Sequence, residues 1–227
     1  MIHALRRNPG RLHLGLMLAL TFSTGIVDAV GYLGLDRVFT GNMTGNVVIL
    51  GMALTGADGL PIVGPIIALV LFMVGAAIAG RTLVKVPAGW STRSTVLFAI
   101  VGIVLLAGAV PMVLLTDPAE PITYAVTGCL GLAMGLQAGA ARHIGVKDVT
   151  TVVVTSTIVG LAFDSRIASG SKQPWLRRAG AIVLIGVGAF VGALLLNIHV
   201  GAGMATAAGI TLIVALLGHL GRPGPTA

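Results

Sequence analysis

The sequence predicts an all-α transmembrane protein with six spanning helices and two short re-entrant or broken helices, arranged as two inverted repeats. Three observations support this prediction: the composition, an internal duplication and the charges of the loops. Of the 227 residues, 56% are hydrophobic and only 9% are charged, and the mean hydropathy is +1.02. Because a soluble domain needs more charge than this to cover its surface, we expect the chain to lie in a lipid bilayer.

Six apolar segments are long enough to cross a bilayer, which takes roughly 20 apolar residues. They are Leu12–Leu35, Leu60–Leu83, Thr95–Leu115, Ile122–Ala141, Ala179–Asn197 and Gly201–Leu220. We expect them to form a single transmembrane domain over residues 1–227. Residues 12–115 are its predicted first repeat and residues 122–220 its predicted second repeat.

Two further apolar segments, Thr40–Thr55 and Thr150–Phe163, are too short for a comfortable span. If both crossed, the protein would have eight spans and the loop with Arg81 and Arg93 would lie outside, against the positive charge that cytoplasmic loops carry. If both enter and return on one side, thirteen of the fourteen Lys and Arg residues are cytoplasmic, as are both termini. We therefore favour six spans with two re-entrant segments, and eight spans is the alternative.

In the favoured topology, the cytoplasmic cations are Arg6, Arg7, Arg11, Arg81, Lys85, Arg93, Arg142, Lys147, Arg166, Lys172, Arg177, Arg178 and Arg222. The outer loops carry Asp58, Asp117 and Glu120, with Arg37 as the one external cation. Each half then has three crossings, so the second half begins from the opposite side of the membrane and the repeats are inverted. Inverted repeats with broken or re-entrant helices are a common plan of secondary transporters. A duplicated bundle without transport is the alternative.

The duplication itself lies in the two short segments. Residues 32–50 (YLGLDRVFTGNMTGNVVIL) and 143–161 (HIGVKDVTTVVVTSTIVGL) are identical at six aligned positions. Irregular polar chain at membrane depth must be buried in protein or line a wet cavity. We therefore predict a solute site whose polar contacts are Thr40, Asn42, Thr44 and Asn46 in the first copy and Thr151 and Thr155 in the second. A short helix starting here would also direct its N-terminal amides at an anion or polar group. Plain helix packing is the alternative.

Asp28 is the one acid well inside a predicted span, where a carboxylate costs roughly 2.5 to 3.5 kcal/mol on insertion scales. We predict that it carries a coupling proton or pairs with a cationic solute. The alternatives are capping by backbone amides or pairing with Arg142. Gln137, in the corresponding helix of the second half, is predicted to be a neutral ligand contact. Gly139 stands at the position that corresponds to Asp28, so the second half has no matching acid.

No catalytic triad, phosphate loop, dinucleotide fingerprint or zinc spacing is present in the sequence, so we expect neither an enzyme nor a bound cofactor or metal. The net charge of +7 lies mainly in short loops beside spans, where it orients a membrane protein and does not indicate nucleic-acid binding. The expected partners are the lipid bilayer and a small solute of unknown identity. Assembly into a homo-oligomer is left open.

The runs GIVDAVGYLGLDRVFTGNMTGNVVILG (25–51) and GLQAGAARHIGVKDVTTVVVTSTIVGLA (135–162) resemble the YoaK-like bacterial membrane proteins, a family of unknown function. The resemblance covers nearly the whole chain and is most specific in the D-x-x-x-Y and TGNMTGN elements. It implies a multi-pass protein of the bacterial inner (cytoplasmic) membrane and no particular substrate. From the residues themselves we predict a secondary transporter or exporter of a small polar or charged solute, with proton coupling through Asp28 as an option. A passive small-solute channel and a non-transporting membrane scaffold are the alternatives.

Overall fold

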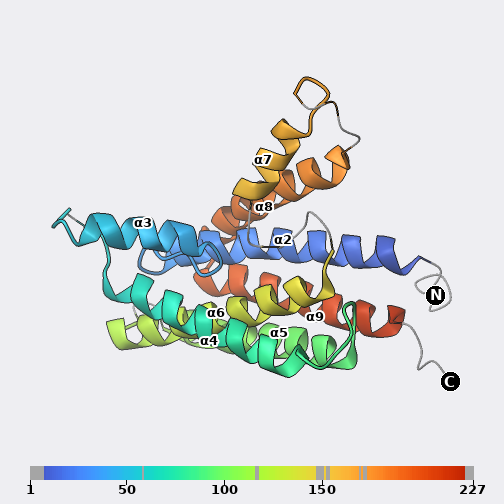
Figure 1. Cartoon of the computed structure of the whole chain (residues 1–227). Coiled ribbons are helices and arrows are strands. Elements are labelled where there is room, and N and C mark those ends of the chain that lie inside the picture. Colours follow the sequence, from blue (N-terminus) through green and yellow to red (C-terminus); the bar gives the residue numbers. More distant parts are fainter. Residues whose placement is uncertain are drawn as a thin grey trace.

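The computed structural model describes residues 8–57, 59–115, 118–146, 151, 154–168, 170 and 173–222, and in these residues it is all-helical. Six helices are long and apolar enough to cross a membrane, which confirms the predicted all-α fold with six candidate spans. They are α2 (Pro9–Gly34), α4 (Val63–Leu83), α5 (Thr92–Leu114), α6 (Glu120–Ile144), α8 (Trp175–Leu196) and α9 (Val200–Gly221). The two short helices are α3 (Met43–Ala53) and α7 (Thr155–Phe163) (Figure 1).

The helix ends lie within a few residues of the predicted ones, and local chemistry explains several of them. Pro9 opens α2, where its missing N–H costs no hydrogen bond. Ser91 caps α5 by accepting a bond from the Ser94 amide. Gly145 ends α6 in the left-handed conformation, with φ of 73°. Among the charges used for topology, Arg6, Arg7, Asp58, Asp117, Lys147 and Lys172 lie outside the described residues.

The first short segment enters the protein and returns to the same end. After α2 the chain reverses and runs back beside it, since the Val38 amide donates to the Gly31 carbonyl at 3.3 Å. Helix α3 then leads out again, and its 11 residues rise roughly 17 Å, about half of a bilayer core. The start of α4 lies at the end where α2 finishes, because Arg37 donates to the carbonyl of Gly59 at 2.9 Å. A re-entrant segment would follow such a path, and its position relative to the membrane stays a prediction.

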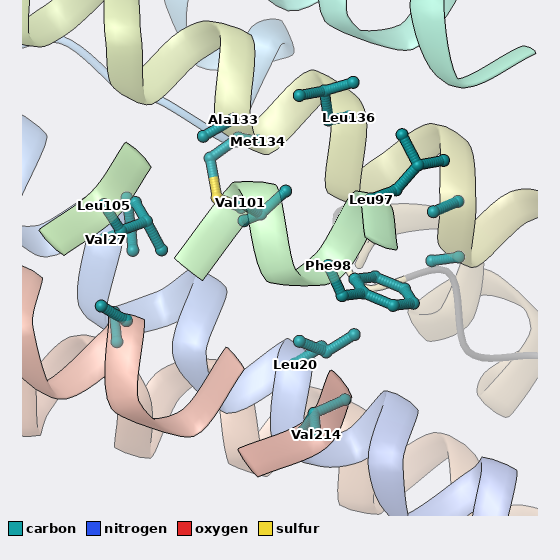
Figure 2. Packing of buried hydrophobic residues seen from close by; sticks show 14 of the residues in the cluster. Leu20, Val27, Leu97, Phe98, Val101, Leu105, Ala133, Met134, Leu136 and Val214 are labelled. Carbon is teal, nitrogen blue, oxygen red and sulfur yellow. The ribbon is translucent and has the colours of Figure 1, made fainter. Parts of the chain in front are cut away.

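Helices α2, α5, α6 and α9 share the hydrophobic core. Its buried side chains include Leu20, Val27, Leu97, Phe98, Val101, Leu105, Ala133, Met134, Leu136 and Val214 (Figure 2). Helices α4 and α8 lie further out, and the residues they bury are mostly glycine and alanine. The outer helices are therefore joined to the core helices by close backbone contact.

Helix α8 crosses α2 with backbone against backbone. A Cβ atom at Gly25 would lie 2.1 Å from the carbonyl oxygen of Ile185, and one at Gly188 would lie 2.1 Å from that of Phe22. No side chain fits at either position unless the helices move apart. Small residues of this kind allow helices to approach closely in membranes.

Helix α4 crosses α6 in the same way. A Cβ atom at Gly135 would lie 2.1 Å from the carbonyl oxygen of Phe72, and one at Gly75 would lie 2.2 Å from that of Leu132. Gly135 in α6 thus takes the place that Gly25 has in α2. Other contacts are matched too, because α3 packs on α4 as α7 packs on α8, and α6 packs on α5 as α2 packs on α9. These pairs support the predicted repeat, whose inverted relation stays a prediction.

The matched crossings change one detail of the sequence alignment. With Gly25 equivalent to Gly135, Asp28 corresponds to Ala138 and not to Gly139. The reason is that helix packing sets the register inside the bundle, and the link to the short helix is one residue longer in the second half. In either register the second half has no acid at this place.

Candidate functional site

The carboxylate of Asp28 holds the turn that leads into α3. Its Oδ1 accepts bonds from the amides of Thr40 at 3.0 Å, Gly41 at 2.7 Å and Asn42 at 3.3 Å. The Asp28 side chain is buried, with 8% of the residue exposed. Three charge-assisted bonds compensate for that burial. Of the roles that the sequence left open for Asp28, amide capping is present, and pairing with Arg142 is absent among the described residues.

The three amides that precede α3 therefore point at an anion, which is the side chain of Asp28. The prediction concerned the N-terminal amides of the short helix itself. Of these, the Gly45 amide donates to Asn42 Oδ1 at 3.3 Å. Binding of an anion or polar group at this helix end stays a prediction.

Two of the predicted site residues face the protein. Asn46 is 1% exposed, and its amide group brackets Phe39, accepting from the backbone N–H at 2.9 Å and donating to the carbonyl at 2.6 Å. The hydroxyl of Thr40, also fully buried, donates to the Val27 carbonyl at 3.4 Å. Both side chains hold the re-entrant turn in shape.

Four other predicted residues line one cavity of about 300 Å³ between the two short helices. Asp28, Asn42 and Thr44 come from the first half, and Thr155 comes from the second. Asn42 also caps α3, since its Oδ1 accepts from the Gly45 amide at 3.3 Å. Asn42, Thr44 and Thr155 are exposed, so the cavity opens to the surface.

The remaining wall of the cavity comes from residues that the sequence did not indicate. It is formed by Gly41, Met43, Phe72, Val154 and Ile185. Phe72 and Ile185 are the residues whose carbonyl groups meet glycines at the two helix crossings. The matched crossings thus bring equivalent positions of α4 and α8 to the cavity. Only the glycine spacing could have pointed to them, because an apolar residue in a span carries no signal of its own.

Gln137 and Thr151, the last two predicted residues, are buried but do not line the cavity. Gln137 Nε2 donates to the hydroxyl of Thr24 at 3.0 Å, and Thr24 donates to the Leu20 carbonyl at 2.9 Å. Within the described chain, Gln137 Oε1 and Thr151 Oγ1 have no hydrogen-bond partner. Thr151 also has a positive φ of 60°, which is unusual for a β-branched residue. A ligand role for these two residues stays a prediction.

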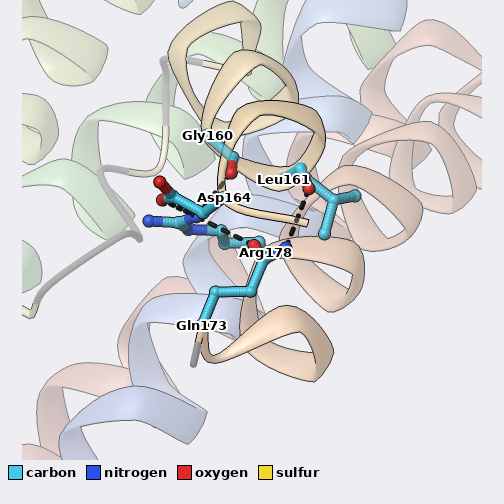
Figure 3. A network of polar contacts seen from close by, with 5 residues as sticks. All are labelled: Gly160, Leu161, Asp164, Gln173 and Arg178. Atoms are coloured by element: carbon cyan, nitrogen blue, oxygen red, sulfur yellow. Dashed lines mark hydrogen bonds and ion pairs between the residues drawn. The ribbon is translucent and has the colours of Figure 1, made fainter. Parts of the chain in front are cut away.

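The second short helix is held by a polar cluster that sequence reasoning missed. Arg178 Nη1 donates to the Gly160 carbonyl at 2.6 Å, to Asp164 Oδ2 at 2.6 Å and to Gln173 Oε1 at 2.9 Å (Figure 3). Gln173 in turn donates to the Leu161 carbonyl at 2.9 Å. The cation thus serves the carbonyl end of α7, where helices favour positive charge. In the predicted topology, Arg178 is only one of the cytoplasmic cations.

Two acids, Asp36 and Glu120, lie at the end of the bundle where α2 finishes. Burial, and then the carboxylate of Glu120, raise the pKa of Asp36, while Arg37 acts in the opposite direction. Because Asp36 follows α2 and Glu120 begins α6, the two helices run in opposite directions. That arrangement agrees with an odd number of crossings in the first half.

In a comparison with known proteins, residues 16–217 match the family described as "Protein of unknown function (DUF1275)". The chain is also similar to the UPF0700 transmembrane protein YoaK of Bacillus subtilis (strain 168), with 32% identity over 187 residues. That alignment covers 79% of this chain and 82% of the relative. No solved structure matches.

Proposed function

The chain belongs to the DUF1275 family of unknown function, with a relative that is named as a transmembrane protein, and we propose that it is a secondary transporter or exporter of a small polar or charged solute. The observation that supports this most is the cavity between the short helices. It is lined by Asp28, Asn42 and Thr44 from one half and Thr155 from the other. A site shared by two repeat units is where secondary transporters bind their solutes.

The matched helix crossings supply a framework for alternating access. In that mechanism one repeat moves against the other around a fixed site. Helix α7 is the natural moving part, since among the described helices it packs only on α8. Its first residue, Thr155, lines the cavity, while its polar anchor at Arg178 lies at its other end.

Asp28 gives the proposal a means of coupling to protons. Its Oδ1 is occupied by backbone amides, whereas its Oδ2 has no hydrogen-bond partner within the described chain. A proton and a solute would compete for this one oxygen. Such competition turns a proton gradient into a driving force for exchange.

The test is flux into proteoliposomes that contain the full-length protein, with an imposed pH gradient and a panel of radiolabelled small solutes. We expect saturable uptake of at least one solute, lowered at least tenfold by Asp28→Asn. Asp36→Asn is the matched control, because Asp36 is an acid of the same helix end that does not line the cavity. Flux that rises linearly without saturation and ignores the gradient would indicate a passive channel.

A scaffold function is the second candidate, and the observation that favours it is the inward orientation of Asn46 and Thr40. In a scaffold, Asn42→Ala and Asn46→Ala would both lower stability and no solute would alter the thermal unfolding of any variant. In a transporter, a bound solute raises the unfolding temperature. Asn42→Ala would then reduce that shift.

A further inference from the structure

We propose that the cavity selects a small organic cation, with the free oxygen of Asp28 as its counter-ion. The inference rests on the proposed function only in taking the cavity as the solute site. It adds the charge and the approximate size of the solute. Neither follows from membership of the family.

The first argument is the charge of the lining. Asp28 is the only ionisable residue among those that form the described wall of the cavity, which has no Lys, Arg or His. A cation that enters would meet one full negative charge and no repulsion. An anion would meet that charge without any compensating cation, and like charges at close range in a low dielectric repel strongly.

The second argument is the geometry of the carboxylate. Three backbone N–H groups donate to Oδ1. The same bonds fix the orientation of the carboxyl group, so that Oδ2 is left for another donor. Asp28 is more than nine-tenths buried, and a buried charge needs a partner of opposite charge or hydrogen bonds to compensate for its burial.

The third argument is the apolar part of the wall. Met43, Phe72 and Ile185 line the cavity beside Asp28. Aromatic faces and thioether groups accommodate alkylammonium groups, which carry a charge together with apolar carbon. The volume of about 300 Å³ equals roughly ten water molecules in the liquid. An organic cation of modest size fits this description better than a bare metal ion.

The experiment uses three solutes of nearly equal shape and different charge: choline, 3,3-dimethylbutan-1-ol and 3,3-dimethylbutanoate. Guanidinium, n-butylammonium and tetraethylammonium extend the cation set. Thermal unfolding of the purified full-length protein in detergent is measured at increasing solute concentration. We expect at least one cation to raise the unfolding temperature saturably, while the neutral and anionic analogues leave it unchanged.

Asp28→Asn is the decisive variant, because asparagine keeps an oxygen that can accept the amides of Thr40, Gly41 and Asn42. It should weaken cation binding at least tenfold. If this variant does not fold, Thr155→Lys tests the same idea from the other wall, where the side chain is exposed. The introduced cation should abolish binding, and Thr155→Gln should preserve it.

The outcomes separate this inference from transport itself. Cation binding that depends on Asp28, without flux in proteoliposomes, would uphold the cation site and overturn the transporter. Saturable flux of a neutral or anionic solute alone would uphold transport and overturn the cation site. Equal stabilisation by choline and its neutral analogue, or no stabilisation by any cation, would also overturn it.

Discussion

The two short helices pack on equivalent helices, α3 on α4 and α7 on α8, and the polar anchors described above lie at opposite ends of them. The first helix, α3, is held where it begins. Asp28 accepts hydrogen bonds from the amides before α3, and Asn46 bonds the backbone N–H and carbonyl of Phe39. The second is held where it finishes, by Arg178 on the carbonyl end of α7. Both helices begin at the cavity. The anchor described for α3 therefore lies beside the cavity, whereas the Arg178 cluster lies at the other end of α7.

This difference teaches that a repeated backbone can serve unequal roles. Equivalent crossings at Gly25 and Gly135 give both halves one geometry. The anchoring side chains described for the two short helices differ, being Asp28 and Asn46 in the first half and Arg178 in the second. The following variants test that division, in order of decreasing expected effect.

The largest loss of stability should follow Asp28→Ala. It leaves three amides at this turn without their acceptor. Unsatisfied buried groups cost about 1–3 kcal/mol each, so we expect a total loss of at least about 3 kcal/mol. Asp28→Asn should cost much less, since its side-chain oxygen can still accept. Chemical unfolding in detergent measures both, and equal losses would contradict the capping role of Asp28.

Arg178→Met should come next, at about 2–3 kcal/mol, because it removes bonds to Gly160 and Gln173 and a partly exposed ion pair with Asp164. The damage should be confined to α7, whose amides should exchange with deuterium faster while those of α3 do not change. Arg166→Met, at an exposed position, is the control. Faster exchange in α3 as well would mean that the polar anchors of α3 and α7 are not independent.

Asn46→Ala should cost about 1–3 kcal/mol, since it removes both bonds to Phe39. Its effect should appear as faster exchange at the start of α3 and leave α7 unchanged. Thr44→Ala, which removes an exposed hydroxyl of the same helix, should stay within about 0.5 kcal/mol. A similar loss in the two variants would remove the distinction between bracing and cavity-lining residues.

The smallest effect concerns Asp36, which follows the end of α2. Burial and Glu120 raise the pKa of Asp36 in the folded protein. The folded state therefore holds a proton on Asp36 at a higher pH than the unfolded state does, and the contribution of Asp36 to stability improves as pH falls through the raised pKa. Asp36→Asn should therefore raise the unfolding temperature slightly at pH 7. The gain should disappear near the ordinary pKa of aspartate, about 3.9. A gain that grows at low pH would have the wrong sign.

The long helices could be predicted because bilayer thickness sets a minimum apolar length, which six segments meet. The short segments could be identified because polar residues interrupt apolar sequence in both copies, among them Asn42 in the first and Thr155 in the second. Asp28 was singled out by the cost of burying its charge, and that cost is the reason that it is bonded to three amides.

Other parts of the site carried no such signal. Phe72 and Ile185 reach the cavity through helix crossings, and an apolar residue looks the same in sequence whether it faces lipid or a cavity. Arg178 looked like one basic residue among several near a membrane surface, since its partner Gly160 is a backbone carbonyl. The register of α6 differs by one residue because packing at Gly135, and not the similarity of the short segments, determines it.

The pattern of helix crossings has a consequence for how the protein is made. The main contacts of α2 are with α8 and α9, those of α4 are with α6, and those of α5 are with α9 and α6. Almost every large packing surface of the first half therefore lies against a helix of the second half. During synthesis the first three spans leave the ribosome before their partners exist. The tertiary structure can close only after α9 has been inserted, and each half then acts as the template on which the other folds.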